Sequence, residues 1–305
     1  MNKISKDTFG TYHPILNFTY FCLVLFFGMV FLHPVMMGIA FAGAFSYSLF
    51  LNGKGALKFN LVFVLPMMAV SALVNPLFNH RGMTILTYFM DNPITAESIW
   101  YGIATGFMFG TVILWFSCYN AVITSDKFIY IFGKVIPVMS LVFAMILRFI
   151  PKFKAQIQVV SGGQRCIGRD VGSGTLIQRA GHGLKILSIM VTWALENGID
   201  TADSMRARGY GLPGRTSYSI FRFDTRDKWM SLFGAGTLLL VGIPYLMGAN
   251  GVQFFPVMKV SENTFAGSIQ FFGYVLLCFG PLLIDAFDSI RWRRIENDKK
   301  GTGVL

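Results

Sequence analysis

The feature that most constrains this chain is a series of long apolar runs separated by short polar segments. The first run, residues 15–32, contains no charged residue. About 18–20 apolar residues are enough for a helix to cross the ~30 Å hydrocarbon core of a bilayer. Only 13% of the 305 residues are charged, against about 25% in ordinary globular chains, and the mean hydropathy is +0.56. The sequence therefore predicts an all-α, polytopic helical membrane protein.

Six of these runs are expected to span the membrane. Their ranges are 15–32, 35–51, 59–77, 98–123, 229–247 and 265–287. The segment 78–96 mixes polar and apolar residues, and we expect a loop there with room for a short interfacial helix. The spans divide the chain into three parts: N-terminal membrane helices at 1–123, a cytoplasmic region at 124–228, and C-terminal membrane helices with a basic tail at 229–305.

The basic residues predict the orientation of the chain. If the N-terminus is cytoplasmic, all of the 26 Lys and Arg residues except Arg81 and Lys259 fall on the inner side. This bias is typical of membrane proteins, and it accounts for the net charge of +11 without nucleic acid as a partner. We therefore expect a multi-pass protein of the cell membrane with both termini in the cytoplasm.

The apolar segment 128–150 is not counted as a span. Lys134 and Arg148 lie 14 residues apart, which is about 21 Å of helix and shorter than the hydrocarbon core. Basic residues flank both ends, so a crossing would place one basic cluster on the wrong side. We expect a helix in or just under the inner leaflet, bent at Pro137 and Pro151.

The cytoplasmic region is too basic and too regular for a simple connection. Residues 175–206 have the apolar period of an amphipathic helix about 48 Å long, and 151–169 forms a second long element. Each ends in a cluster of Gly and Arg. The clusters contain Gln164, Arg165, Gly168 and Arg169 in the first, and Arg206, Ala207, Arg208 and Gly209 in the second.

The second cluster has the chemistry of a docking site. Gly209 can end the helix, and its small neighbours let the backbone approach a partner closely. The planar guanidinium of Arg208 can then reach a cluster of carboxylates or carbonyls on that partner. For Arg215, Arg222 and Arg226 the alternative, contact with lipid phosphates, is the preferred interpretation.

Catalytic chemistry is not indicated by the sequence. There is no GxxxxGK[ST] loop to hold the phosphates of ATP, no CxxC pair, and no nucleophile or acid–base pair with an evident partner. We expect no catalytic, cofactor-binding or metal site in this chain. Any ATP would be bound by another chain.

A resemblance to a known family rests on the second cluster. The segment TADSMRARGYG, followed by Arg215-Thr216, resembles the signature of the transmembrane T component of energy-coupling factor (ECF) transporters. That family carries two Ala-Arg-Gly-like motifs at the ends of two coupling helices. Ala207-Arg208-Gly209 matches the second motif. The first should lie within 164–170, where this chain has Ile-Gly-Arg at 167–169 in place of Ala-Arg-Gly. Both Arg165 and Arg169 are candidates for its arginine, and Arg169 is favoured because it lies beside Gly168.

The resemblance implies a scaffold and not an enzyme. Such a subunit joins two ABC-type ATPases, which bind ATP and Mg, to a small substrate-binding membrane subunit (S subunit) that takes up a vitamin or other micronutrient. Two alternatives are kept. A CDP-alcohol phosphotransferase-like enzyme needs several aspartates at helical spacing, and here Asp200 and Asp203 are followed by arginines. A channel or self-contained secondary transporter needs ionisable residues in its spans, which are almost bare.

Overall fold

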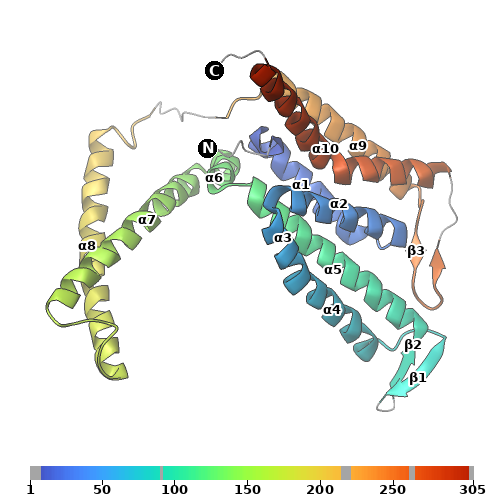
Figure 1. The fold of residues 1–305 in the computed structure, drawn as a ribbon, viewed down its shortest axis with the longest axis horizontal. Coiled ribbons are helices and arrows are strands. Elements are labelled where there is room, and N and C mark those ends of the chain that lie inside the picture. The colour runs from blue at the N-terminus through green and yellow to red at the C-terminus, as the bar shows by residue number, and fades with distance from the viewer. Residues whose placement is uncertain (1–7, 90–91, 214–220, 261–264, 302–305) are drawn as a thin grey trace. The chain divides into compact units, whose positions relative to one another are not determined.

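The structure, a computed structural model, describes residues 8–89, 92–213, 221–260 and 265–301 (Figure 1). Helices make up most of the described chain. The chain divides into two compact units. We call residues 1–128 and 221–305 the terminal unit, and residues 129–220 the central unit. The predicted all-α, polytopic helical fold is confirmed.

The terminal unit contains the candidate membrane spans. Its helices are α1 (Pro14–Val30), α2 (Pro34–Asn52), α3 (Lys54–Phe59), α4 (Leu65–Phe78), α5 (Ala96–Val122), α9 (Thr225–Leu246) and α10 (Phe265–Gly301), with a π-helical turn at Asn60–Val64 between α3 and α4. Among the described residues, five helical segments are apolar and long enough to cross a bilayer: α2, the continuous stretch Lys54–Phe78, α5, α9 and Phe265–Trp292 of α10. The sixth predicted span, α1, is apolar but has 17 residues, about 26 Å of helix.

Two His-Pro pairs start the first two helices. His13 and His33 are the N-caps of α1 and α2, and each is followed by a proline at the first helical position. The Nδ1 atom of His13 accepts from the amide of Ile15 at 3.4 Å, and that of His33 accepts from Val35 at 3.3 Å. A proline there costs no hydrogen bond, because the first amides of a helix have no partner within it.

Glycines bring α4 and α5 into close contact. Gly102 and Gly106 lie one turn apart on α5, and a Cβ atom at either would lie 2.6–2.7 Å from a backbone carbonyl oxygen of α4. Small residues at this spacing let the backbones of two membrane helices approach and pack by dispersion. The α4–α5 contact therefore depends on the absence of side chains at these two positions.

Aromatic side chains fill the centre of the terminal unit. Trp115 of α5 is fully buried and packs edge-on against Tyr20 and Phe21 of α1, with ring centroids 6.2 and 6.3 Å apart. The hydroxyl of Tyr20 donates to the carbonyl of Leu277 on α10 at 2.8 Å. Three helices far apart in sequence are thus joined in one core.

The segment that precedes α1 is fixed by buried charged side chains. The backbone amide of Phe9 donates to Asp285 on α10 at 2.6 Å, and that of His13 donates to Asp227 on α9 at 3.0 Å. Lys127 donates to a carbonyl of the same segment. The two aspartates and the lysine are each less than 10% exposed. The first residues of the described chain are therefore held by the start of α9, the middle of α10 and the start of α6 (Ser125–Val135).

Two short hairpins lie between helices of the terminal unit. The strands are β1 (Ile85–Phe89) with β2 (Asn92–Thr95), and β3 (Val252–Gln253) with β4 (Lys259–Val260), both antiparallel. The short helix expected in 78–96 is therefore wrong for the described residues of that segment, which form an irregular stretch at 79–84 followed by the first hairpin. Glu97 stabilises the first hairpin. Its carboxylate accepts hydrogen bonds from the amide and the hydroxyl of Thr84, which connects the residue before β1 to the start of α5.

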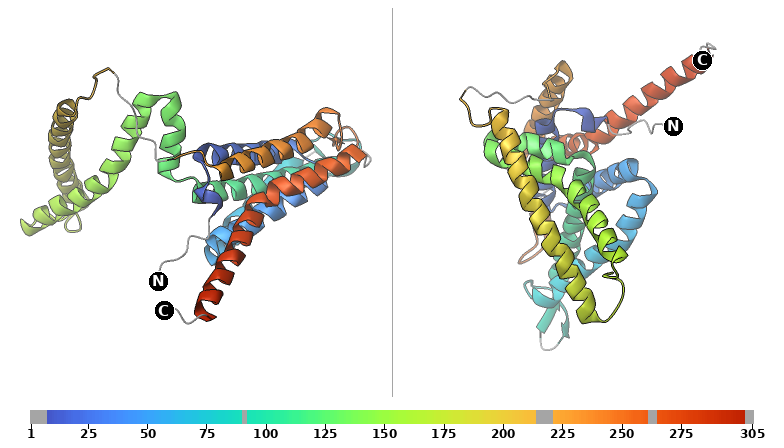
Figure 2. Two further views of the ribbon diagram at one scale, coloured as in Figure 1. Left: turned by 90° about the horizontal axis from the view of Figure 1, so that it is seen from above. Right: turned by 90° about the vertical axis from the view of Figure 1, so that its left-hand side faces the viewer.

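The last helix is longer than predicted. α10 runs from Phe265 to Gly301 and contains Pro281, and Figure 2 shows it bent along its length. The basic tail expected after residue 287 is therefore the end of this helix.

The central unit contains two long helices. α6 (Ser125–Val135) leads into it, and α7 (Pro137–Cys166) and α8 (Leu176–Ala207) form its body. The predicted break at Pro137 is confirmed, since Ile136 leaves the helical conformation with φ −133° and ψ 82°. The prediction that the long element starts at Pro151 is wrong, because α7 continues through that proline. A proline in a helix interior removes one hydrogen bond, and the other bonds of this 30-residue helix keep it continuous.

Candidate functional site

Helix α7 ends in a tight glycine cap that we call tip 1 (residues 164–169). Ile167 is the C-cap residue of α7, with φ −96° and ψ 18°, and Gly168 follows it with φ +79°. The amide of Gly168 donates to the carbonyl of Arg165 at 3.0 Å, and that of Arg169 donates to Gln164 at 2.9 Å. This pair of bonds is a Schellman motif, which requires a left-handed residue and so favours glycine.

Helix α8 ends in the same way, in what we call tip 2 (residues 205–210). Arg208 caps the helix with φ −84° and ψ 8°, and Gly209 follows with φ +77°. The amide of Gly209 donates to Arg206 at 2.9 Å, and that of Tyr210 donates to Met205 at 3.0 Å. The prediction that Gly209 ends this helix is confirmed.

The two caps give the residue correspondence between the tips. The corresponding pairs, with tip 1 first, are Gln164 and Met205, Arg165 and Arg206, Cys166 and Ala207, Ile167 and Arg208, Gly168 and Gly209, and Arg169 and Tyr210. Neither arginine considered for the first motif occupies the place of Arg208. That place in tip 1 belongs to Ile167, which is 62% exposed.

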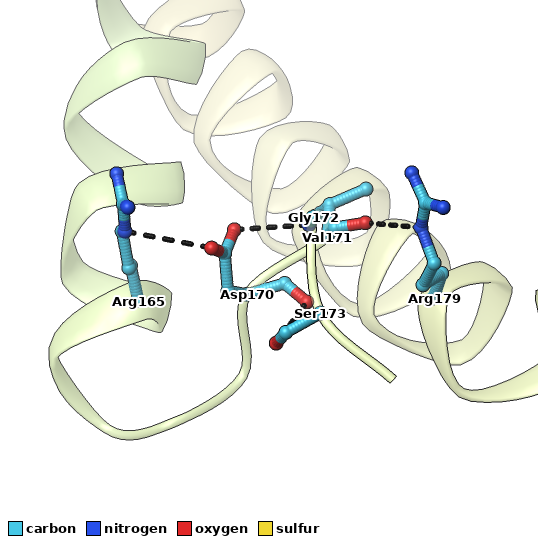
Figure 3. A network of polar contacts seen from close by, with 6 residues as sticks. All are labelled: Arg165, Asp170, Val171, Gly172, Ser173 and Arg179. Atoms are coloured by element: carbon cyan, nitrogen blue, oxygen red, sulfur yellow. Dashed lines mark hydrogen bonds and ion pairs between the residues drawn. The ribbon is translucent and has the colours of Figure 1, made fainter. Parts of the chain in front are cut away.

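The connection after tip 1 is held by a small polar network (Figure 3). The Nε atom of Arg165 lies 3.4 Å from Oδ2 of Asp170, whose other oxygen accepts from the amide of Gly172 at 3.1 Å. From the other side, Nε of Arg179 donates to the carbonyl of Val171 at 2.7 Å. The network restrains the loop between α7 and α8, and it engages the guanidinium of Arg165 within the same unit.

Tip 2 presents its cations to solvent. Arg206, Ala207 and Arg208 are exposed, and Gly209 is half-buried. A Cβ atom at Gly209 would lie 3.2 Å from the Cδ1 atom of the flexible Leu212 side chain, so glycine is favoured there mainly by the backbone conformation, with φ +77°. Arg215 and Thr216, which completed the sequence motif, lie outside the described residues.

Helices α7 and α8 contact each other through aromatic and polar side chains. The ring of Phe153 on α7 lies edge-on to Trp193 on α8, with centroids 5.2 Å apart. Lys152 lies 5.6 Å from the centroid of the same indole and donates to Oδ1 of Asn197 at 2.6 Å. Ile186 and Met190, both less than 10% exposed, are the buried apolar side chains of α8.

An apolar groove of about 750 Å³ runs beside this contact. Both helices contribute to its walls, which consist of Ile146, Phe149, Ile150, Phe153, Lys154, Ile157 and Gln158 of α7 and Ala194 and Gly198 of α8. Its isoleucines remain open, with Ile146, Ile150 and Ile157 each about half exposed. The central unit thus carries two kinds of surface, the cationic or apolar tips and an apolar groove.

Sequence reasoning identified the region of tip 1 but not Ile167. The signal was present, because aligning Gly168 with Gly209 as helix-ending glycines places Ile167 on Arg208. The groove could not be predicted from the sequence. Its residues come from both α7 and α8, and the sequence of neither helix shows where the two helices make contact. Within the described part of the chain, no group of three or more His, Cys, Asp or Glu side chains could hold a metal ion.

Comparisons with known proteins bear on these observations. No protein-family model matches the chain. The energy-coupling factor transporter transmembrane protein EcfT of Lactobacillus helveticus (strain DPC 4571) is 35% identical over 114 residues, which are 37% of this chain and 40% of that protein. The EcfT of Leuconostoc gelidum subsp. gasicomitatum is 29% identical over 97 residues, or 32% and 36% of the two chains. The match spans about two fifths of the length of these relatives, and over that stretch the predicted resemblance to the transmembrane T component of ECF transporters is confirmed.

Proposed function

We propose that the chain is the membrane scaffold subunit of an ECF-type ABC importer. In this proposal it couples ATP hydrolysis by two ABC-type ATPase subunits to a small S subunit, and the complex takes up a vitamin or other micronutrient. The relatives' name, which describes an ECF transporter transmembrane protein, supports a place in such a complex. ATP and Mg belong to the partner ATPases.

The observation that carries this proposal is the pair of tips. Two long helices of one unit end in the same Schellman motif, with φ +79° at Gly168 and +77° at Gly209. α8 alone is 32 residues, about 48 Å, so it can transmit a displacement of one end to the other as a rigid element. Two like ends on one unit suit a pair of ATPase subunits, each with a groove for one tip.

The apolar groove supports a second partner. Isoleucine side chains that stay about half exposed over several helical turns form an apolar patch, and a patch of this kind is typical of a surface that binds another protein or a membrane. We assign the groove to the S subunit, which is itself a membrane protein. Movement of the tips would then be passed through α7 and α8 to that subunit.

The proposal includes an orientation for the chain. With both termini in the cytoplasm, the two hairpins of the terminal unit face outward and the central unit faces inward. Single cysteines in a cysteine-free background would test this with an impermeant thiol reagent on intact cells. Met83→Cys and Gln253→Cys, at exposed positions of the hairpin regions, should be labelled, whereas Glu196→Cys on α8 should not. Labelling of Glu196→Cys in sealed cells would contradict the orientation.

The main experiment tests Arg208 as the principal ATPase anchor. Truncating one partner of a buried charge pair costs about 2–5 kcal/mol, or ~30- to several-thousand-fold in affinity. We expect Arg208→Glu to lower ATPase retention on the tagged chain by at least about 30-fold, and substrate uptake with it. Arg222→Glu, the same charge change at an exposed arginine outside the tips, is the matched control and should change little.

Two results would contradict the proposal. If Arg208→Glu is expressed normally and supports full uptake, this arginine does not dock an ATPase. If the purified chain, rigorously freed of ATPase subunits, hydrolyses ATP above a no-protein control, the chain is not a scaffold alone.

A further inference from the structure

The two tips share a backbone but differ in chemistry. The C-cap residues of the two helices have nearly the same dihedral angles, with φ −96° and ψ 18° at Ile167 and φ −84° and ψ 8° at Arg208. The Cα–Cβ bonds of the two residues therefore leave their helix ends in the same direction. Any groove that receives the backbone of one tip would meet isoleucine at tip 1 where it meets arginine at tip 2.

We propose that Ile167 is the docking residue of tip 1 and fits an apolar, uncharged groove on its ATPase, while Arg208 fits an acidic groove. This inference rests on the proposed function, and it assigns to each tip its own kind of partner surface. The ATPase pair can then bind the scaffold in one orientation, because exchanging its two grooves would mismatch both tips.

The argument from electrostatics is direct. A groove whose carboxylates pair with Arg208 would, on receiving Ile167, hold buried charges without a partner. Such unpaired charges are strongly unfavourable. An uncharged groove lined by apolar side chains would bury the 62% of Ile167 that is now exposed. Specificity then comes from repulsion of the wrong tip as well as attraction of the right one.

The cationic side chains near tip 1 occupy other places. Arg165 corresponds to Arg206, two residues before the C-cap residue, and it contacts Asp170 at 3.4 Å. Arg169 corresponds to Tyr210, beyond the glycine, and is exposed. In a docked complex Arg169 would lie beside the groove and not in its centre. Charges at the rim of an interface contribute less to affinity than groups at its centre.

The residues that flank the C-cap residue on each side also differ in polarity between the two tips. In tip 2 the positions that often make an apolar contact across a Schellman motif are Met205 and Tyr210, whereas in tip 1 they are Gln164 and Arg169. In tip 2 a cationic C-cap residue is therefore combined with an apolar pair of flanking residues. In tip 1 an apolar C-cap residue is combined with a polar pair. The difference at Ile167 is thus part of a consistent difference between the two ends.

The test uses the whole complex, purified through a tag on this chain. Ile167→Arg gives tip 1 the residue of tip 2. If the grooves differ as proposed, ATPase retention should fall at least about tenfold, because a charge is forced into an apolar groove. Ile167→Leu should stay within about twofold. Ile177→Arg, at an isoleucine that is 86% exposed on the first turn of α8, is the matched control and should also stay within about twofold.

The outcomes separate this inference from the proposed function. If the unmodified chain retains no ATPase, the proposed function fails. If it retains ATPases and loses them with Arg208→Glu, but Ile167→Arg binds as tightly as the unmodified chain, only the present inference is overturned. An equal loss with Ile167→Leu would overturn it too, since size and not polarity would then decide.

A second measurement does not depend on stability. A photo-crosslinking amino acid placed at 167 or at 208 should form adducts with different ATPase segments. The segment crosslinked from 208 should carry Asp or Glu side chains, and the segment crosslinked from 167 should be apolar. Adducts on the same segment from both positions would overturn the inference.

Discussion

The terminal and central units differ in what covers their apolar side chains. In the terminal unit Trp115, Phe21 and Val24 are fully buried against other helices of the same unit. In the central unit only Ile186 and Met190 are buried among the described hydrophobic residues, while Leu184, Leu187 and Leu195 are 59–66% exposed. Both units are helical, but the first contains its own core and the second leaves most of its apolar surface open.

The exposed surfaces also differ in their neighbours. The open apolar residues of the terminal unit lie on helices that are long and apolar enough for a bilayer, so that lipid can cover them. Those of α8 alternate with charged residues along an amphipathic helix. The terminal unit can therefore leave its open apolar residues to lipid, whereas the central unit keeps its open apolar residues on an amphipathic surface, which the proposed function assigns to partner proteins.

The largest effect is expected where the terminal unit is most closely packed. Gly106→Leu places a side chain 2.7 Å from the carbonyl of Met68, and neither backbone can move without separating α4 from α5. We expect a loss of about 3 kcal/mol of stability, seen as a lower melting temperature and less monodisperse protein in detergent. Gly38→Leu, at an exposed glycine with open space around it, is the control. If Gly106→Leu is tolerated equally well, the terminal unit is not closed in the way described.

A smaller loss of stability is expected at a buried carboxylate. Asp227 accepts from the amides of His13 at 3.0 Å and Asp224 at 2.9 Å and is 5% exposed. Asp227→Ala leaves both donors without this partner, which should cost about 2 kcal/mol. Asp200→Ala, on the exposed surface of α8, should leave the melting temperature unchanged. Equal effects of the two changes would remove the contrast between the units.

How much of this could be predicted from the sequence depends on the range of the interactions. The helix α8 was predicted at 175–206 and lies at Leu176–Ala207, because its apolar period is local and its end is set by a glycine. The hairpins were missed, because strands of two to five residues have too few positions to show alternation. Glu97 fixes one of them through a contact with Thr84, 13 residues away in the sequence.

The candidate site divides in the same way. Arg208 and Gly209 could be predicted as parts of the candidate site, because helix, arginine and glycine are adjacent in the sequence. The correspondence of Ile167 with Arg208 required the dihedral angles of the two caps, whereas the sequence prediction of an arginine at this place favoured Arg165 and Arg169. The groove depends on how α7 crosses α8, which is decided by contacts such as that of Phe153 with Trp193.

The groove gives a prediction that affects binding and not stability. Gly198 lies in its wall, and there is open space where its Cβ would be. Gly198→Trp should fill much of the groove, lowering S-subunit retention and uptake about tenfold, as expected when a large side chain blocks the centre of an interface. ATPase retention should stay within about twofold. Gly181→Trp, also on α8 with open space at its Cβ but outside the groove, is the control.

If both tryptophan variants retain the S subunit equally, the groove is not its binding surface. If Gly198→Trp instead releases the ATPases, the groove and the tips form one surface, and the assignment of separate partners to them is wrong.

The smallest effect is expected where α7 and α8 meet. Lys152→Met keeps the aliphatic part of the side chain but removes the bond to Asn197 at 2.6 Å and the cation beside Trp193 at 5.6 Å. Together, the two contacts of this exposed lysine contribute about 0.5–1 kcal/mol. Hydrogen exchange of the amides around 152 and 197 should therefore become about 2- to 5-fold faster.

Lys185→Met, at another exposed lysine of the central unit, serves as the control and should leave this exchange unchanged. The effect on uptake separates two ways in which the central unit could work. If α7 and α8 must move as one body, a looser contact lowers uptake together with the protection from exchange. If uptake is unchanged while hydrogen exchange accelerates, α7 and α8 transmit force independently through their tips. The central unit would then not act as one rigid domain, in contrast to the closely packed terminal unit.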